Sequence, residues 1–215
     1  MAPLPLITEN DVDLLRERIS SRIKGHRYLH TLGVEKEIVA LGELYLPQDI
    51  LRLRASALLH DITKELSTAE QLALCNRYNI PVTPADRLSP KTFHAKTAVG
   101  VIRDEYPAFA DPVILDAIEK HTTGAREMSI FSRLLYLADY IEETRTFPDC
   151  VALRKAFWDP IPNTPKEQRM MHLNRILLHS FDLTISSLIE DESIIALATI
   201  DARNALIEEI SMHNL

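Results

Sequence analysis

The chain has 215 residues, of which 46% are hydrophobic and 26% charged, with a formal net charge of −7. This composition is typical of a globular protein with a sizeable core and excludes a disordered chain. The acidic balance leaves no broad basic footprint, so we expect no nucleic-acid partner. No apolar run reaches about 18 residues and no secretory signal pattern is present, so we expect no membrane partner and a cytoplasmic location.

Apolar residues recur with helical spacing, and sustained two-residue alternation is absent. Thr8 and Thr68 are expected to cap helices, and the proline-containing segment 80–91 is expected to be a loop. We therefore predict an all-α fold. Its expected helices cover about residues 9–23, 27–45, 50–63, 68–78, 93–105, 112–122, 129–142, 167–188 and 199–212.

Three prolines between Asp159 and Pro165 mark the best candidate for an internal boundary. Few residues follow it and no internal repeat occurs. We therefore expect a single domain over residues 1–215, with carboxy-terminal helices at about 166–215 packed on the rest. Exposed apolar faces on these terminal helices favour a homodimer.

Four histidines and two aspartates occur at helical stretches or their ends, in the order His30, His60, Asp61, His94, His121 and Asp139. Imidazole and carboxylate groups are the usual ligands of iron, manganese, zinc and related divalent ions. Burying so many ionisable groups without partners costs free energy. The pattern therefore predicts a metal site.

Helical spacing indicates how these residues are aimed. His121 continues the apolar face of Ile118, and Asp139 continues that of Leu135, so both are expected to face inward. His60 and Asp61 are adjacent and point about 100° apart on a helix, so they do not chelate as an i, i+4 pair. We expect them to present two side chains into one cleft, or to bridge two ions.

The ordered set H…HD…H…H…D resembles the HD-domain superfamily of metal-dependent phosphohydrolases. The blocks RYLHTLGV, ALLHDITK, FHAKTAVG, KHTTGAREMS and LLYLADYIEETRTFPD are similar to those of the YqeK-type symmetrical diadenosine tetraphosphatases. The similarity covers about residues 25–156, which would form the catalytic core. It implies an HD-domain helical bundle with additional C-terminal helices.

The resemblance also implies an activity and a set of roles. The activity is hydrolysis of diadenosine tetraphosphate and related dinucleoside polyphosphates to ADP, with an iron-containing site. The residues that match metal ligands are His30, His60, Asp61 and Asp139. His94 and His121 match positions that meet the phosphates or hold a second ion. Arg27, Lys64 and Arg145 match basic positions around the nucleotide.

The carboxy-terminal match is thinner. This chain has Ala196-Leu197-Ala198-Thr199 where members often have His/Tyr-Pro-x-Thr before the final helix. Thr199 and Asn204 are expected to line the nucleotide pocket. Trp158 is expected either to pack a helix end or to stack on an adenine. Glu142 is expected to lie solvated at the end of its helix and to orient Arg145.

Phosphoanhydride chemistry suits such a site. A bound ion lowers the pKa of a water molecule and neutralises developing charge. Asp61 is the expected general base, and His94 or His121 is the expected proton donor to the leaving diphosphate. Lys64 contributes a mobile charge. The ligand types also accept manganese, cobalt, nickel or zinc.

Two other functions fit the same residues. One is a different HD phosphohydrolase, such as a nucleotidase, a dNTP triphosphohydrolase or a cyclic-nucleotide phosphodiesterase. The other is a non-catalytic sensor that uses the pocket only to bind a nucleotide.

Overall fold

A computed structural model describes residues 6–213, and every regular element within that range is helical. The predicted all-α fold is confirmed. Five short 3-10 helices accompany the α-helices in the described range. The α-helices are α1 (Glu9–Arg22), α2 (Gly25–Tyr45), α3 (Ile50–Leu59), α4 (Thr68–Arg77), α5 (Pro84–Leu88), α6 (Phe93–Glu105), α7 (Pro112–Lys120), α8 (Ile130–Ile141), α9 (Pro148–Trp158), α10 (Arg169–Glu190) and α11 (Leu197–Met212).

Side-chain caps define where the first and fourth helices begin. Thr8 accepts a hydrogen bond from the backbone N–H of Asp11, as the pattern predicts, and Asp11 accepts one from the Thr8 backbone in return. The cap of α4 is Ser67, whose hydroxyl accepts from the N–H of Glu70. The prediction that Thr68 is that cap is wrong by one residue, because Ser67 has the extended backbone that a cap requires.

Prolines mislead the prediction for residues 80–91. This segment contains α5 and a 3-10 helix at Pro90–Thr92 rather than an unbroken loop. Pro84 occupies the first turn of α5, where the missing N–H costs nothing, and Thr83 caps the helix. Pro148 begins α9 in the same way. That helix is absent from the sequence-based prediction.

The helix α3 ends at Leu59, four residues before the predicted end at Thr63. Residues 60–65 form turns instead. His60 donates from Nδ1 to the carbonyl of Ala57 at 2.7 Å. The side chains of His60 and Asp61 therefore point into the molecule from the end of α3, and not from one face of a helix.

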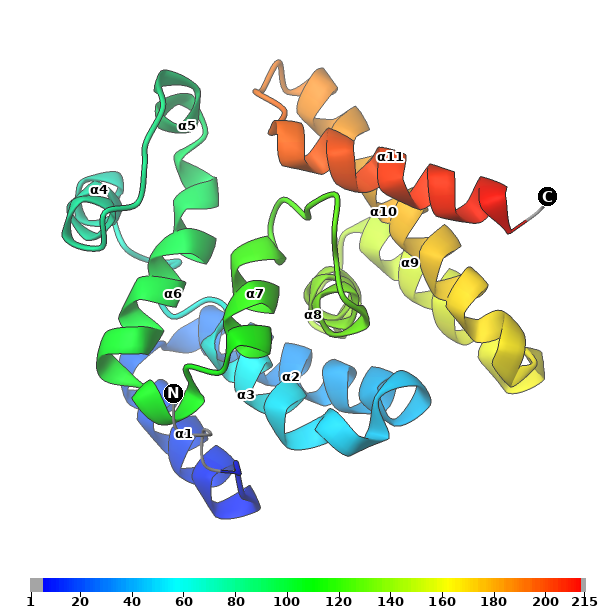
Figure 1. The fold of residues 1–215 in the computed structure, drawn as a ribbon, viewed down its shortest axis with the longest axis horizontal. Helices are drawn as coiled ribbons and strands as arrows, with labels where there is room; N and C mark the ends of the chain where they lie inside the picture. The colour runs from blue at the N-terminus through cyan, green and yellow to red at the C-terminus, as the bar shows by residue number, and fades with distance from the viewer. Residues whose placement is uncertain (1–5, 214–215) are drawn as a thin grey trace.

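The centre of the molecule is built by α2, α3, α7 and α8, which pack on one another (Figure 1). Their inward residues Ile38, Leu53, Leu58, Ile118 and Leu135 have no exposed surface. Helix α6 packs on α7, and α4 packs on the far side of α6. The apolar core therefore surrounds the segments that carry the histidines.

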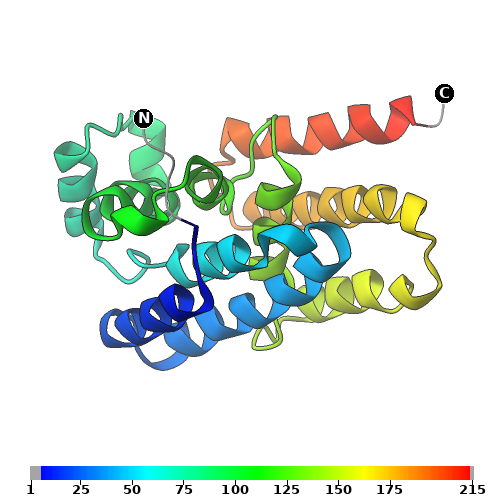
Figure 2. The same cartoon turned by 60° about the horizontal axis from the view of Figure 1, so that its bottom comes forward.

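The helices α9, α10 and α11 lie together on the other side of α8 (Figure 2). Phe181 of α10 stacks on Tyr136 of α8 with ring centroids 4.5 Å apart. Arg133 of α8 donates to Asn174 at 2.8 Å and to Glu209 at 2.5 Å. That all 215 residues form one domain stays a prediction. None of the helices in residues 6–213 is long and apolar enough to cross a membrane.

Candidate metal centre

The six predicted histidines and aspartates converge from five segments of the chain. His30 comes from α2, His60 and Asp61 from the turn after α3, and His94 from the first turn of α6. His121 lies at the end of α7, and Asp139 lies in α8. All except Asp139 are buried, and the Asp139 side chain is 19% exposed. The structure brings the whole set together.

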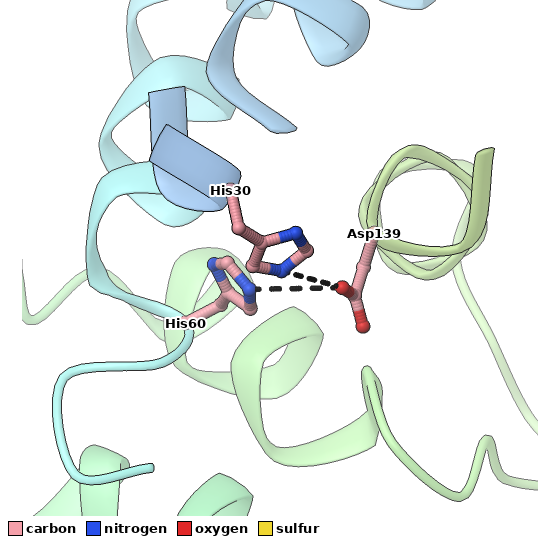
Figure 3. A group of neighbouring side chains, drawn as sticks. All are labelled: His30, His60 and Asp139. Carbon is pink, nitrogen blue, oxygen red and sulfur yellow. Dashed lines mark ion pairs between the residues drawn. The ribbon is translucent and has the colours of Figure 1, made fainter. Parts of the chain in front are cut away.

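One group of neighbouring ligand atoms comprises His30, His60 and Asp139, whose ligand atoms all lie within 4.8 Å of one another. Figure 3 shows both imidazoles directed toward the Asp139 carboxylate. His30 Nε2 is 3.0 Å from Asp139 Oδ1, and His60 Nε2 is 3.9 Å from the same oxygen. These three residues are suited to hold one ion.

A second group comprises His60, Asp61 and His121, again within 4.8 Å. Asp61 Oδ2 lies 3.5 Å from His60 Nε2, and Oδ1 lies 3.6 Å from His121 Nε2. His94 adjoins this group, with its Nε2 at 3.2 Å from Asp61 Oδ1 and 3.1 Å from His121 Nε2. Asp61 Oδ2 is also 3.8 Å from His30 Nε2, so the Asp61 carboxylate adjoins the first group as well.

All four imidazoles are oriented in the same way. His60, His94 and His121 place Nδ1 at 2.6–2.7 Å from the backbone carbonyl three residues earlier. His30 places Nδ1 at 3.0 Å from Glu142 Oε1. Because a carbonyl or carboxylate oxygen only accepts, Nδ1 is the donor, and in the neutral ring Nε2 retains its lone pair. Each ring therefore offers Nε2 to the cluster.

The donor set fits a divalent cation. Nitrogen lone pairs and carboxylate oxygens repel one another at these distances unless positive charge lies among them. Within the described residues, His30 Nε2, His60 Nε2 and Asp61 Oδ1 are buried polar atoms that make no hydrogen bond. Mixed imidazole and carboxylate sets hold iron, manganese, cobalt, nickel or zinc.

Burial and neighbouring charges shift the pKa values of the cluster in different directions. Burial of Asp61 raises its pKa, but His60, His121 and His94 together hold it well below the usual range. Burial likewise opposes ionisation of Asp139, yet Arg145 and His30 keep its pKa well below the usual range. Both aspartates are therefore ionised at neutral pH.

The histidine pKa values diverge. Burial lowers the pKa of His30, but the nearby carboxylates of Asp139 and Glu142 outweigh burial and raise it to about 9. Burial dominates for His94 and lowers its pKa to about 4. Before a cation binds, His30 therefore carries a proton at neutral pH and His94 is neutral.

Three basic residues contact the cluster. Arg27 Nη1 donates to Asp61 Oδ2 at 2.8 Å, and Arg145 Nη2 donates to Asp139 Oδ1 at 2.6 Å. Lys64 Nζ lies 3.1 Å from His94 Nε2, and burial lowers its pKa. Arg27 and Arg145 keep 26% and 32% of their side chains exposed, so an anion arriving from solvent meets them first.

The two residues predicted to line the nucleotide pocket both belong to α11, and their role stays a prediction. Thr199 is buried in α11 and Asn204 is exposed on it, and within residues 6–213 neither hydrogen-bonds to a cluster residue. The preceding segment 194–198 instead lines a cavity of about 320 Å³ together with Ala95 and Thr123. Trp158 donates to Glu37 at 2.6 Å and packs on Phe157, which is the helix-packing alternative.

Two polar residues near the cluster escape the sequence-based assignment. The prediction that Glu142 is solvated is wrong, because its side chain is fully buried against His30. The guanidinium of Arg145 is held by Asp139 and not by the Glu142 carboxylate. Thr122 Oγ1 lies 3.1 Å from His94 Nε2 and 3.2 Å from His121 Nε2. Its position directly after His121, in the block KHTTG, was the available signal.

Comparison with known proteins agrees with this geometry. The HD domain family model matches residues 27–144, which contain all six residues of the cluster. The chain belongs to the HD domain family. The predicted HD-domain resemblance is therefore confirmed. The assignment to a family of hydrolases is confirmed by the relatives described next.

Two curated relatives share much of the sequence. The symmetrical bis(5'-nucleosyl)-tetraphosphatase of Bacillus subtilis is 31% identical over 137 residues, or 64% of this chain and 72% of that protein. The enzyme of the same name from Halalkalibacterium halodurans is 28% identical over 193 residues, covering 89% of this chain and 94% of the relative.

A solved structure shares the fold. The crystal structure of a predicted HD superfamily hydrolase involved in NAD metabolism, from Clostridium acetobutylicum, superposes with a TM-score of 0.78. It is 30% identical in sequence and covers 92% of this chain and 97% of its own. The similarity therefore includes the C-terminal helices as well as the HD domain.

Proposed function

We propose that this protein hydrolyses diadenosine tetraphosphate and related dinucleoside polyphosphates symmetrically, releasing two ADP. The observation that carries the proposal is the convergence of four imidazole Nε2 atoms and two carboxylates beside two partly exposed arginines. The names of the curated relatives support the substrate. A polyanion with two nucleosides suits a basic rim around a metal centre.

We propose His30, His60, Asp61 and Asp139 as the metal ligands, with iron as the first expectation. His94 and His121 would hold a second ion or meet the phosphates. Manganese, cobalt, nickel and zinc fit the same ligand types. When bound, the ion would lower the pKa of a water molecule and neutralise charge on the phosphates.

The side chains divide the remaining work. Asp61 is the proposed general base, because its ionised carboxylate lies at the centre of the cluster. Arg27 and Arg145 would take phosphate oxygens, for which a planar guanidinium is suited, and Lys64 would add a point charge beside His94.

The proton donor to the leaving diphosphate is better assigned to His121 than to His94. The lowered pKa of His94, about 4, leaves it without a proton to give near pH 7. Its ring would instead accept hydrogen bonds from Lys64 or Thr122.

Product analysis tests the proposal directly. Purified protein of known metal content is incubated with diadenosine tetraphosphate, and the nucleotides are separated by chromatography. ADP as the sole product supports symmetrical cleavage. ATP together with AMP would contradict it, because those products require cleavage at a different anhydride.

The Clostridium structure favours a second candidate, since its name refers to NAD metabolism. NAD and its dinucleotide precursors also contain two nucleosides joined through phosphates, so they belong in the same assay. Turnover of these compounds alone would replace the first proposal. No turnover of any nucleotide by metal-loaded protein would favour a binding sensor. Light scattering of the same sample tests the proposed homodimer.

A further inference from the structure

Glu142 makes three hydrogen bonds in a fully buried position just after α8. Its Oε1 accepts from His30 Nδ1 at 3.0 Å and from Thr144 Oγ1 at 2.6 Å. Its Oε2 accepts from the backbone N–H of Thr144 at 2.6 Å. A carboxylate held by three donors has little freedom to turn away from His30.

Gly33 provides the space for this carboxylate. A Cβ atom at position 33 would lie 2.2 Å from Glu142 Oε2 and 3.0 Å from its Cδ. Gly33 is three residues after His30 in α2 and so shares its helix face. Glycine within a helix costs about 0.5–1 kcal/mol relative to alanine. The close approach of Glu142 is a physical reason for glycine at this position.

The position of each histidine in its helix explains why Nδ1 of His30 donates to a carboxylate, whereas Nδ1 of the other three histidines donates to a backbone carbonyl. His60 and His121 lie at helix ends and His94 lies in a first turn, next to the carbonyls that they bind. His30 lies inside α2, where the Arg27 carbonyl is occupied by the helix and by Thr31 Oγ1 at 3.0 Å. Its Nδ1 therefore needs an acceptor from another segment.

Arg154 of α9 fixes the turn that carries Glu142. Its guanidinium donates to the backbone carbonyls of Ile141 and Glu142, and to that of Arg145 at 2.9 Å. The turn therefore has anchors on both sides: His30 on α2 and Arg154 on α9. The position of Glu142 is therefore set in part by Arg154, which lies outside the cluster.

We infer that Glu142 is a positioning residue that fixes the tautomer and direction of His30 for metal binding, in a space kept open by Gly33. The inference rests on the metal site proposed above, but not on the substrate. A carboxylate acceptor on Nδ1 holds the hydrogen there, leaves Nε2 free for the ion and makes the imidazole a stronger ligand. Loss of such a partner weakens metal affinity by roughly 10–100-fold.

Cobalt(II) binding tests this inference without any substrate. Co²⁺ affinity is measured by competition with a chelator, its visible absorption spectrum reports ligand geometry, and circular dichroism monitors folding. Glu142→Gln and Glu142→Ala are expected to lower affinity by roughly 10–100-fold and to change the spectrum. Glu143→Gln is the matched control, because Glu143 is adjacent and 59% exposed. Its affinity is expected to equal that of the unaltered protein.

Two further measurements separate positioning from a general structural role. Nitrogen NMR of the metal-free protein, recorded above the His30 pKa of about 9 so that the ring is neutral, should show the Nδ1–H form of His30. Glu142→Ala should convert it to a mixture of forms. Gly33→Ala should weaken Co²⁺ binding although Glu142 is intact. The double variant Gly33→Ala/Glu142→Ala should bind no more weakly than Glu142→Ala alone, since both changes remove one interaction.

Several outcomes overturn the inference. Folded Glu142→Gln with unaltered Co²⁺ affinity and spectrum would exclude the role, as would additive effects in the double variant. Unaltered protein that binds no Co²⁺ would remove the site itself. Failure to cleave diadenosine tetraphosphate, with the Co²⁺ results as expected, would overturn only the proposed substrate.

Discussion

Arg27 donates a 2.8 Å hydrogen bond to Asp61, so the central carboxylate of the cluster is held by a cation that also reaches solvent. A substrate phosphate would compete for the same guanidinium. Substrate binding and the environment of the proposed base are therefore linked through one side chain.

Replacing Arg27 by alanine is expected to lower kcat/KM for diadenosine tetraphosphate by about 10–100-fold, mainly through a higher KM. The size follows from about 1.5–3 kcal/mol for a hydrogen bond to a charged group, at about 1.4 kcal/mol per tenfold change. Steady-state kinetics and metal analysis are measured together, and the metal content should stay unchanged. Arg103→Ala serves as the control, because Arg103 is exposed on α6. An unaltered KM would remove Arg27 from the phosphate site.

His60→Ala and Asp61→Ala are each expected to abolish metal retention and to reduce activity at least about 100-fold. Both residues belong to the group of ligand atoms around His121, and His60 also belongs to the group around His30. Elemental analysis of purified variants gives the metal content. His26→Ala is the control, because His26 is exposed on the same helix as His30. Full activity and full metal content in either variant would show that the site is assigned incorrectly.

Metal affinity is expected to rise with pH until about pH 9. The raised pKa of His30, about 9, means that a proton must leave before Nε2 binds an ion. The apparent affinity therefore falls as pH drops below that value. Chelator competition at several pH values measures the curve. An ordinary histidine would give a plateau soon after pH 6.5, so a plateau near pH 7 contradicts the assignment.

The stability of the metal-free protein should change with pH as His30 loses its proton. The folded-state pKa of His30 is above the unfolded value of 6.5. The contribution of His30 to the free energy of unfolding is therefore complete below pH 6.5 and is lost as pH rises through about 9. Urea unfolding at a series of pH values should show this loss in metal-free protein. The same curve in His30→Ala would point to another group.

Gln71→Ala is expected to destabilise the protein by about 1–3 kcal/mol, because it leaves buried polar groups without partners. Gln71 donates to the Thr63 carbonyl at 2.5 Å and accepts from Thr97 Oγ1 at 2.6 Å. Thr63 in turn donates to the His94 carbonyl at 3.0 Å. Chemical denaturation measures the change, and exposed Gln48→Ala is the control. A difference below about 0.5 kcal/mol would show that water replaces the amide.

The ordered histidines and aspartates could be predicted as one site because each lies in a strongly periodic helix or at its end. Local signals also suffice for most helices, as the Thr8 cap of α1 shows. Prolines cause the main errors in secondary structure. Pro84 and Pro148 look like breaks in a sequence but begin helices, since their fixed φ suits a first turn.

The role of Glu142 lies beyond local patterns. A glutamate next to another acidic residue at a helix end is usually solvated, and Glu143 is indeed 59% exposed. Burial of Glu142 depends on Gly33, which is distant in the sequence and contributes only by lacking a side chain. The pocket role predicted for Thr199 and Asn204 rests only on the family match, which is thin in this part of the chain, and it stays a prediction.

The contact between His30 and Glu142 joins residues 112 positions apart in the chain. Such a contact needs a long loop to close, and the entropy lost in closing it slows folding. Five residues of the cluster precede α8 in the chain: His30, His60, Asp61, His94 and His121. Asp139 and Glu142 follow later, within α8 and directly after it. During synthesis, the His30 ring therefore becomes fixed only after most of the HD domain has been made. A chain truncated before residue 139 would lack both carboxylates that contact His30, those of Asp139 and Glu142.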